Sequence, residues 1–494
     1  MHTTSRLMAL AGALVLATAI SPALAARTDI SVGLVLEPPN LDPTAGAAAA
    51  IDEVVYANIF EGLTRFGPDG SVNPALAESW DISEDGLTYT FHLHAGVAFH
   101  DGSEMNAEDV KFSLDRARAE DSTNAQKALF ADIASVTVAD PLTVTVTLSQ
   151  PNGSFLFNMA WGDAVIVAPE SAAANATDPV GTGPFLLEDW VQGDHVELVR
   201  NPDYWGEPVK LDKVTFKFIG DPTAGFAAMM AGDVDTFPNF PAPETLPQLA
   251  ADPRFTVIVG STEGETVMAM NNKRAPFDNV KVREAVAHAI NREDIIDGAM
   301  FGYGTPIGTF FAPHNPAYVD LTGLSGYDPE KSKALLAEAG YADGFETTLQ
   351  LPPTPYARRG GEVIAAQLAE VGITAKIENV EWAQWLEGPF KGNYDLTIVS
   401  HTEPFDIGAF AKPGYYFGYE SEAFNQIIAD LTNTTDPEMR TELIKQAQTT
   451  LAEDYAAVFL FELAKTGVAN AKIVGLWENS PAQANDMTGV YWED

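Results

Sequence analysis

The sequence predicts an α/β fold built from more than one domain. Short segments in which every second residue is apolar, the pattern of strands, are interleaved with segments of helical spacing. The 494 residues exceed what one hydrophobic core usually holds, at about 100–200 residues per domain. Apolar residues make up 46% of the chain, which is enough to build such cores and excludes a disordered protein.

The first half of the chain is expected to be rich in strands. A strand is predicted over residues 30–36 and a helix over residues 51–63. A strand-rich block then runs from residue 76 to about residue 169, with the clearest period-two alternation at residues 89–93 and 142–148. We expect this block to form a subdomain with its own sheet.

The second half is expected to contain mainly helices, with strands between them. Asp328 and Pro329 have the character of a capping residue and a first-turn proline, and Gly340 ends the helix that they begin. The other expected elements are a helical face over residues 282–290, a helix ending at Gly372, a strand over residues 373–380, a helix starting at Asp436 and an apolar run over residues 458–461.

The first 25 residues have the features of an export signal. Arg6 supplies a positive start, residues 7–20 form an apolar core, and Ala23-Leu24-Ala25 is a cleavage site of small residues. The apolar core is too short to span a membrane, and no later stretch reaches about 18 uninterrupted apolar residues. We therefore expect a signal peptide over residues 1–25 and a mature chain that is exported and soluble.

Charge and cysteine content narrow the possible partners and compartments. The chain has 28 Lys and Arg against 69 Asp and Glu, a formal charge of −41 that repels nucleic acids and anionic membranes. It has no cysteine, which excludes disulfides, thiolate metal sites, cysteine nucleophiles and a lipid on an N-terminal cysteine. Together with the export signal, these features predict an unanchored protein of the Gram-negative periplasm.

Sequence motifs for catalysis are missing. The chain has no G-x-S-x-G elbow, no H-E-x-x-H zinc motif and no glycine-rich phosphate loop. His92, His94 and His100 invite a metal interpretation, but the first two alternate along a strand pattern and the third precedes an Asp-Gly turn. A secreted hydrolase is therefore the less favoured class, and we expect no catalytic residues, no metal and no cofactor.

Eight short motifs, taken in order, resemble the bacterial extracellular solute-binding proteins of family 5, the dipeptide, oligopeptide and nickel type that serves ABC importers. Each motif alone is a weak signal, whereas their joint order over nearly the whole chain is specific. They read L-A-E-S-W (76–80), F-H-D-G (99–102), V-G-T-G-P-F (180–185), N-P-D-Y-W-G (201–206), G-D-V-D (232–235), P-F-D-N-V-K-V-R (276–283), L-L-A-E-A-G-Y (335–341) and Q-L-A-E-V-G-I (367–373).

The resemblance implies a two-lobe periplasmic binding protein fold, type II-like, with a hinge between the lobes and the solute enclosed between them. It places lobe I at residues 26–265 plus 467–494, with an extra subdomain at about 70–180, and lobe II at residues 266–466. The crossing segments would lie near residues 265–270 and 463–467. A few such residues suffice to absorb the dihedral change of a hinge.

The resemblance also implies residues that meet the solute. In P-Y-A-R-R (355–359), Tyr356 is a candidate contact, and Arg358 or Arg359 would pair with a carboxylate of the solute. A guanidinium fork suits that task, whereas the alternative is that both arginines are solvated surface residues. Trp382 resembles a tryptophan that lines the pocket of peptide-binding members, and a buried core tryptophan is the competing interpretation.

Residues 400–406 depart from the pattern of peptide-binding members. A histidine stands where tryptophan is expected, and the position of the amine-binding aspartate falls on Pro404. An acid one or two positions away would then accept the cationic or hydroxyl-rich end of a solute, or the later acid would only cap a turn. The candidate ligand residues of this segment are His401, Thr402, Glu403, Phe405 and Asp406.

Together these features predict the periplasmic substrate-binding component of an ABC importer. It would capture a dipeptide, an oligopeptide or a peptide-like solute and deliver it to permease subunits in the inner membrane. The alternative is the same fold binding a non-peptide solute, such as an opine, an oligosaccharide, a nickel chelate or haem. We expect a monomer, without a nucleic-acid partner.

Overall fold

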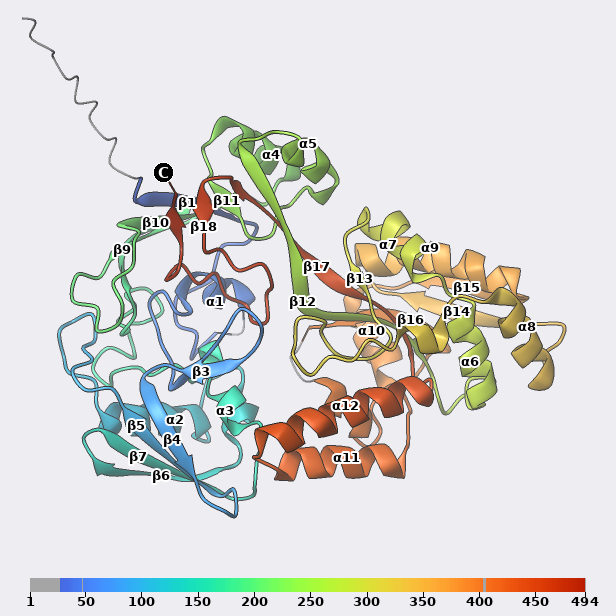
Figure 1. Cartoon of the computed structure of the whole chain (residues 1–494), viewed down its shortest axis with the longest axis horizontal. Coiled ribbons are helices and arrows are strands. Elements are labelled where there is room, and N and C mark those ends of the chain that lie inside the picture. Colours follow the sequence, from blue (N-terminus) through green and yellow to red (C-terminus); the bar gives the residue numbers. More distant parts are fainter. Residues whose placement is uncertain (1–26, 47, 403–405, 494) are drawn as a thin grey trace, which may run out of the picture.

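Two long strands connect the two bodies of the molecule. The computed structural model describes residues 27–46, 48–402 and 406–493. Within these residues, β12 (Phe255–Met270) and β17 (Val458–Asn470) run from one body into the other (Figure 1). We call the body that holds the N-terminal strand lobe I and the other lobe II. The predicted signal peptide, residues 1–25, lies outside the described residues.

A single sheet extends through both lobes, and β12 and β17 are its central pair. Its order is β15-β14-β16-β12-β17-β11-β1-β10-β9-β8, with β13 paired to β17. The α/β prediction is confirmed. The strands of lobe I are β1 (Asp29–Leu34), β8 (Phe185–Val191), β9 (His195–Arg200), β10 (Lys213–Phe218) and β11 (Thr236–Phe237). Those of lobe II are β13 (Thr305–Pro306), β14 (Phe345–Leu351), β15 (Ile373–Asn379) and β16 (Leu396–His401).

Lobe I also contains the separate sheet that the sequence predicted. It is antiparallel, in the order β4-β5-β7-β6, and helix α2 (Ala107–Arg118) packs on it around a core of its own. Asn106 caps α2, and Asp109 completes a capping box. The strands are β4 (Ala77–Ile82), β5 (Thr88–Leu93), β6 (Ile133–Asp140) and β7 (Thr143–Leu148). The predicted alternation at 89–93 and 142–148 therefore does form strands.

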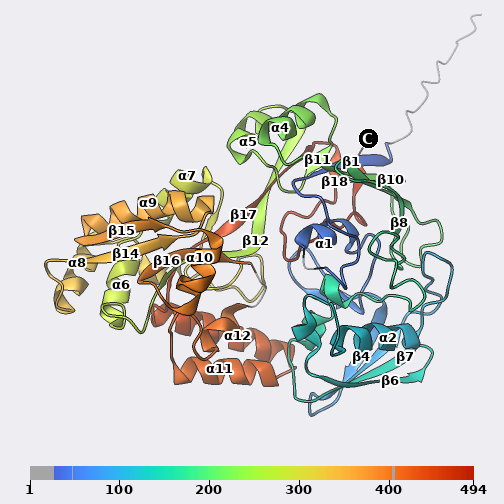
Figure 2. The same ribbon diagram turned by 180° about the vertical axis from the view of Figure 1, so that it is seen from behind.

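Helices cover the sheet of lobe II and extend toward lobe I (Figure 2). Asp328 and Asp436 cap two of these helices as predicted, each followed by a proline in the first turn. The helices are α6 (Val280–His288), α7 (Arg292–Met300), α8 (Pro329–Glu338), α9 (Pro355–Glu370), α10 (Trp382–Glu387), α11 (Glu422–Asn433) and α12 (Pro437–Glu453). Helices α4 (Pro222–Ala231) and α5 (Leu246–Ala250) belong to lobe I.

The helix predicted over residues 51–63 is wrong in its extent. Helix α1 (Ala49–Val55) ends early, because Tyr56 adopts an extended backbone and Ala57 a left-handed one with φ of 58°. The following residues to Leu63 are buried. Their apolar spacing therefore reflects burial of an irregular segment and not continuation of the helix.

The pairing of β12 with β17 changes register where the strands pass between the lobes. Residues from Phe255 to Ser261 pair on the lobe I side, and pairing resumes at Glu265, opposite Glu462, on the lobe II side. Beyond this break both strands are almost completely buried. The connection between the lobes is therefore a pair of strands with a short irregular stretch.

Two glutamates face each other at this crossing. Glu265 and Glu462 are register partners, 4% and 0% exposed, and one carboxylate oxygen of each has no hydrogen-bond partner among the described residues. Glu263 lies nearby, with Oε1 2.7 Å from His314 Nε2. Burial, and then the charge of neighbouring carboxylates, raises the pKa of Glu265 and of Glu462 well above the ordinary value of 4.5. The folded state therefore favours protonated carboxyl groups at the crossing.

Glu462→Gln should weaken the pH dependence of stability, because the amide keeps the volume of the carboxyl group but cannot become charged. A carboxyl group whose pKa is raised on folding stabilises the fold below its unfolded pKa, and that contribution is lost as the pH rises above about 4.5. We expect similar melting temperatures for variant and wild type at pH 5. At pH 8 the variant should be more stable, by about 1–3 kcal/mol.

Glu330→Gln on α8 is the matched control, since that side chain is 85% exposed. Its melting temperature should follow that of the wild type at every pH. Parallel pH profiles for Glu462→Gln and the wild type would contradict protonation at the crossing.

Candidate functional site

The residues that the sequence singled out follow three neighbouring strands of lobe II. Strand β14 is parallel to both β15 and β16, so their carboxyl ends point in the same direction (Figure 1). The segments that follow begin at Pro352, Val380 and Thr402. Ligands of open α/β sheets bind at such carboxyl ends. The chain fold therefore brings these three segments to one edge of the sheet, although Glu403 and Phe405 lie outside the described residues.

Arg358 and Arg359 point to different places. Arg358 reaches the neighbouring segment, where Nη2 donates to Glu381 Oε1 at 3.0 Å and to the carbonyl of Val380 at 3.4 Å. Its Nε is buried and has no partner among the described residues. Arg359 is exposed, and its guanidinium lies 5.1 Å from the ring centre of Phe301 at the end of α7. Of the two arginines, only Arg358 is directed along the edge formed by the carboxyl ends of β14, β15 and β16, which we call the strand-end edge.

Tyr356 and Trp382 occupy different surroundings. Tyr356 is half-buried and packs against the main core of lobe II. Trp382 is 40% exposed and meets the buried ring of Trp385 edge-on, with ring centres 5.6 Å apart. Trp385 is the core tryptophan, and its indole N–H donates to Thr397 Oγ1 at 3.0 Å. Phe390 is also partly exposed beside Trp385, so this part of the edge presents aromatic surface.

His401, at the end of β16, is buried and contacts a polar side chain with each of its ring nitrogens. Its Nδ1 lies 2.5 Å from Asp406 Oδ2 and its Nε2 lies 2.7 Å from the hydroxyl of Tyr416. The Asp406 carboxylate is thus already held by a side chain of the same lobe, at the start of a short 3₁₀ segment. Thr402 is exposed. Of the acids proposed for the cationic end of a solute, Asp406 is therefore committed to an internal contact.

Buried polar atoms without partners gather at this edge. Such atoms are uncommon in folded proteins, and each is a candidate for a missing ligand or water. Among the described residues, those that border the carboxyl ends of β14 and β16 are Gln350 Oε1, Thr354 Oγ1, Arg358 Nε and Ser400 Oγ. The edge therefore offers both donors and acceptors.

Lobe I has a small cavity at the carboxyl end of β1. Its volume is about 110 Å³, enough for a small polar group. Glu53 is its acidic residue, and burial raises the pKa of Glu53 to about 7 although Lys465 opposes that shift. Lys465, itself buried on β17, donates to the carbonyl of Trp477 at 2.7 Å. The lining is formed by residues 33–36 with Glu53, Pro238, Asn239 and Asn485.

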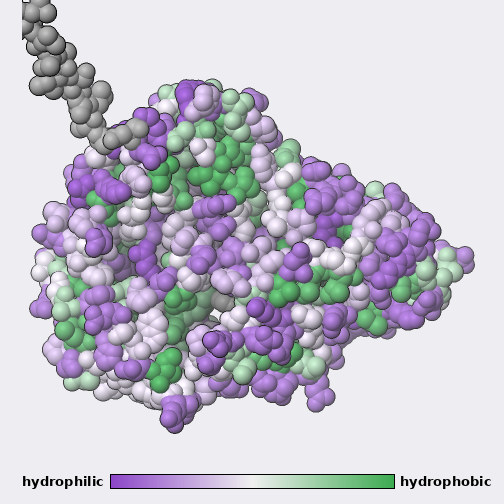
Figure 3. All heavy atoms as spheres, in the orientation of Figure 1, coloured by the Kyte–Doolittle hydropathy of each residue, from purple (hydrophilic) through white to green (hydrophobic). Residues whose placement is uncertain are grey.

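These lobe I residues and the acids of the crossing were not identified from the sequence. A usable signal was present for Glu462, because it directly follows the apolar run at residues 458–461. The surface is hollowed between the lobes, below the crossing strands (Figure 3).

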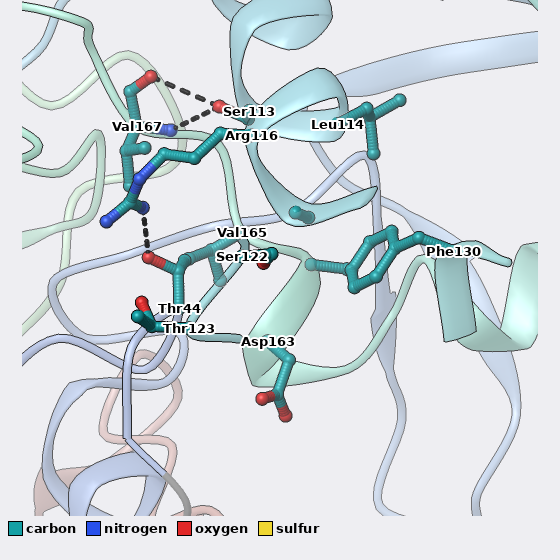
Figure 4. Close-up of a pocket in the computed structure, with 12 residues that line it drawn as sticks. Thr44, Ser113, Leu114, Arg116, Ser122, Thr123, Phe130, Asp163, Val165 and Val167 are labelled. Carbon is teal, nitrogen blue, oxygen red and sulfur yellow. Dashed lines mark hydrogen bonds between the residues drawn. The ribbon is translucent and has the colours of Figure 1, made fainter. Parts of the chain in front are cut away.

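A cavity beside α2 and the clusters of titratable side chains offer little to a solute. The cavity beside α2, where Arg116 donates to Thr44 Oγ1 and Ser113 bonds the backbone of Val167, has a volume of about 20 Å³ (Figure 4). That is room for about one water molecule. Across the described ranges, no group of three or more His, Asp or Glu side chains is placed to hold a metal ion. No helix in the same part of the chain is both long and apolar enough to cross a membrane.

Comparison with known proteins agrees with this architecture. The chain is 31% identical over 495 residues to a glutathione-binding protein of Salmonella choleraesuis (strain SC-B67), covering 94% of this chain and 95% of that protein. The solved structure of the DppA periplasmic binding protein of Helicobacter pylori, in complex with the peptide STSA, is 27% identical with a TM-score of 0.74, over 95% and 99% of the two chains. That of HbpA2 from Haemophilus parasuis is 26% identical with a TM-score of 0.87, over 94% and 100%.

A family profile gives the same result over a continuous stretch. Residues 71–416 match the middle region of the bacterial extracellular solute-binding proteins of family 5. This stretch includes the separate sheet of lobe I, the strand β12 and the three segments at the edge of lobe II. The chain therefore belongs to the bacterial extracellular solute-binding proteins, family 5.

Proposed function

We propose that the chain captures a peptide or peptide-like solute between its lobes and delivers it to the permease of an ABC importer. The observation that carries this proposal is the position of Arg358 at the strand-end edge, with a buried Nε that lacks a partner. A free guanidinium donor in a binding edge suits a carboxylate, which every peptide has at its C-terminus. A glutathione-binding relative and a peptide-bound structural neighbour support the same class of solute.

The two lobes offer complementary groups for such a solute. Arg358 would hold the carboxylate, and the exposed face of Trp382 would cover an apolar side chain. For the cationic amine, Glu53 in the lobe I cavity is a better acceptor than Asp406, whose carboxylate His401 already contacts. A solute with a carboxylate at one end and an ammonium group at the other would thus bridge the cleft.

A thermal-shift screen tests the class of solute directly. Glutathione, dipeptides, opines, oligosaccharides, nickel–histidine and haem would each be added to the purified chain. A compound that binds only the folded state raises the melting temperature in proportion to the logarithm of its concentration. We expect glutathione or a dipeptide to give the largest shift. A shift confined to one of the other compounds would support the non-peptide alternative and contradict the proposal.

The remaining assignments follow from the same proposal. Residues 1–25 are a cleaved signal peptide, and the mature chain is a periplasmic monomer that meets permease subunits of the inner membrane. Lobe I comprises residues 26–265 and 467–494, with the extra subdomain at about 70–180, and lobe II comprises residues 266–466. The register break of β12 between Ser261 and Glu265 lies close to the proposed lobe boundary and supports it.

Arg358→Ala should weaken binding of glutathione by about 2–5 kcal/mol, as expected when one partner of an enclosed charge pair is removed. Arg359→Ala on the same helical turn is the matched control. The Arg359 guanidinium contacts Phe301 instead, so the affinity of the Arg359→Ala variant for glutathione should stay within about threefold of the wild type. Isothermal titration calorimetry measures both. Equal affinities for the two variants and the wild type would show that no carboxylate binds at this edge.

Glu53→Gln should reduce affinity for a solute with a free amine by about 10- to 100-fold, because a hydrogen bond to a charged group contributes about 1.5–3 kcal/mol. Asp406→Asn should change it little, since that carboxylate already contacts His401. Affinity for the N-acetylated form of the same peptide should be insensitive to Glu53→Gln. A large loss for Glu403→Gln alone would move the amine site to lobe II and refute the role of Glu53.

Binding should bring the lobes closer together, because only a closed arrangement lets both lobes contact one solute. Small-angle scattering with and without saturating glutathione should show a smaller radius of gyration with the ligand. An unchanged radius at saturation, with binding established by calorimetry, would contradict closure.

A further inference from the structure

The lobes also touch at a second place, away from the crossing strands (Figure 1). The loop before Phe155 in lobe I meets the turn between α11 and α12 in lobe II, and both ribbon views show these elements side by side (Figures 1 and 2). The Gly153 N–H donates to the carbonyl of Thr432 at 2.8 Å. Thr435 of lobe II also lies close to Gly86 and Pro151 of lobe I. A Cβ atom on Gly86 would lie 3.5 Å from Thr435 Cγ2 and 3.7 Å from Pro151 Cβ.

Arg440 secures this contact from the lobe II side. Its Nη1 donates to the carbonyls of Leu431 at 2.8 Å and Thr434 at 3.2 Å, and its Nη2 donates to Ser154 Oγ of lobe I at 3.1 Å. These carbonyls belong to the end of α11, where carbonyl groups lack helical partners and a cation is favourable. The guanidinium therefore orders the turn and holds it against lobe I at the same time.

The lobe I side is shaped to receive the guanidinium. A Cβ atom on Gly153 would lie 1.9 Å from Arg440 Nη1 and 2.1 Å from the carbonyl oxygen of Thr434, so only glycine fits here. The loop itself is fixed within lobe I, because Asn152 Nδ2 donates to Asp132 Oδ2 at 2.9 Å and the hydroxyl of Tyr89 donates to the carbonyl of Asn152 at 3.2 Å. The loop of lobe I and the α11–α12 turn of lobe II are thus each held by bonds within their own lobe, and their surfaces are complementary where they meet.

We propose that the Gly153–Arg440 contact is a second pivot between the lobes. Two bodies joined at two separated points can turn only about the line through both points. With β12 and β17 as one point and this contact as the other, closure becomes a rotation about a fixed line. This role rests on the proposed capture of a solute between the lobes, since the pivot directs the closing motion, whereas the contact itself is independent of any solute.

Spin-label distances test the contact without a ligand. The chain has no cysteine, so Glu84→Cys and Glu438→Cys, both at exposed positions, place one label on each side. The distance distribution should be narrow in this background. Adding Arg440→Met, which keeps the apolar stem but removes the guanidinium, should broaden it at least twofold, whereas Arg254→Met at an exposed site of lobe I should not. An unchanged distribution with Arg440→Met would overturn the proposal.

Cross-linking distinguishes a pivot from a contact that must open. Pro151→Cys and Thr435→Cys, one on each side of the contact, would be joined by a short thiol cross-linker, and Arg440 itself stays unchanged. If the contact is a pivot, glutathione should lower the radius of gyration of the cross-linked chain as much as that of the same chain before cross-linking (the reduced chain), as measured by small-angle scattering. If only the reduced chain is compacted, the pivot is refuted. If glutathione compacts neither, the proposed function fails for glutathione, and the spin-label result alone decides the pivot.

Discussion

The paired strands β12 and β17 impose the constraint on which the rest of the structure depends. The same hydrogen-bonded pair completes a buried sheet in lobe II and, under the proposed capture of a solute, must also let the lobes change their relative position. A continuous antiparallel pair of strands resists bending, because a sharp bend breaks hydrogen bonds between the two strands. The register break between Ser261 and Glu265 meets both demands, since it confines the loss of pairing to a few residues.

The acidic residues at the crossing are best understood within this constraint. Glu265 and Glu462 are fixed opposite each other by the strand register, in a region with little access to water. Two adjacent buried carboxylates cannot both be charged without a large penalty, so the fold favours the protonated form of these groups. In a chain that formally carries −41 charges, burial thus raises the pKa of the two glutamates that face each other where the lobes join, which disfavours their charged forms.

Much of the fold could be predicted from local patterns, whereas the site could be predicted only in part. The caps at Asp328 and Asp436 and the alternation of β5 and β7 are signals within a few residues, and the structure has them as expected. The three strand-end segments were found through family motifs. The choice between Arg358 and Arg359 was not, because neighbouring residues on a helix point about 100° apart and spacing alone does not show which neighbour each meets.

What could not be predicted depends on contacts between distant parts of the chain. The helix expected to reach Leu63 stops at Val55 because the following residues are buried by other segments. The pairing of Glu265 with Glu462 joins positions that no periodicity relates, and so does the meeting of Gly153 with Thr432. Such contacts follow from topology, which is decided by the packing of whole elements.

The arginines of this acidic chain differ between the proposed binding region of lobe II and the scaffold. Arg283 donates to the carbonyls of Tyr455, Phe277 and Asp454, and Arg292 donates to Phe459 and Ser325, so the donor groups of both are satisfied by the protein itself. Those arginines tie the backbone of separate segments of lobe II together. Arg358 differs, because its Nε is buried without a partner among the described residues, near the carboxyl ends of the parallel strands β14, β15 and β16. A donor left unsatisfied costs stability, and the role proposed for Arg358 in holding a solute would account for that cost.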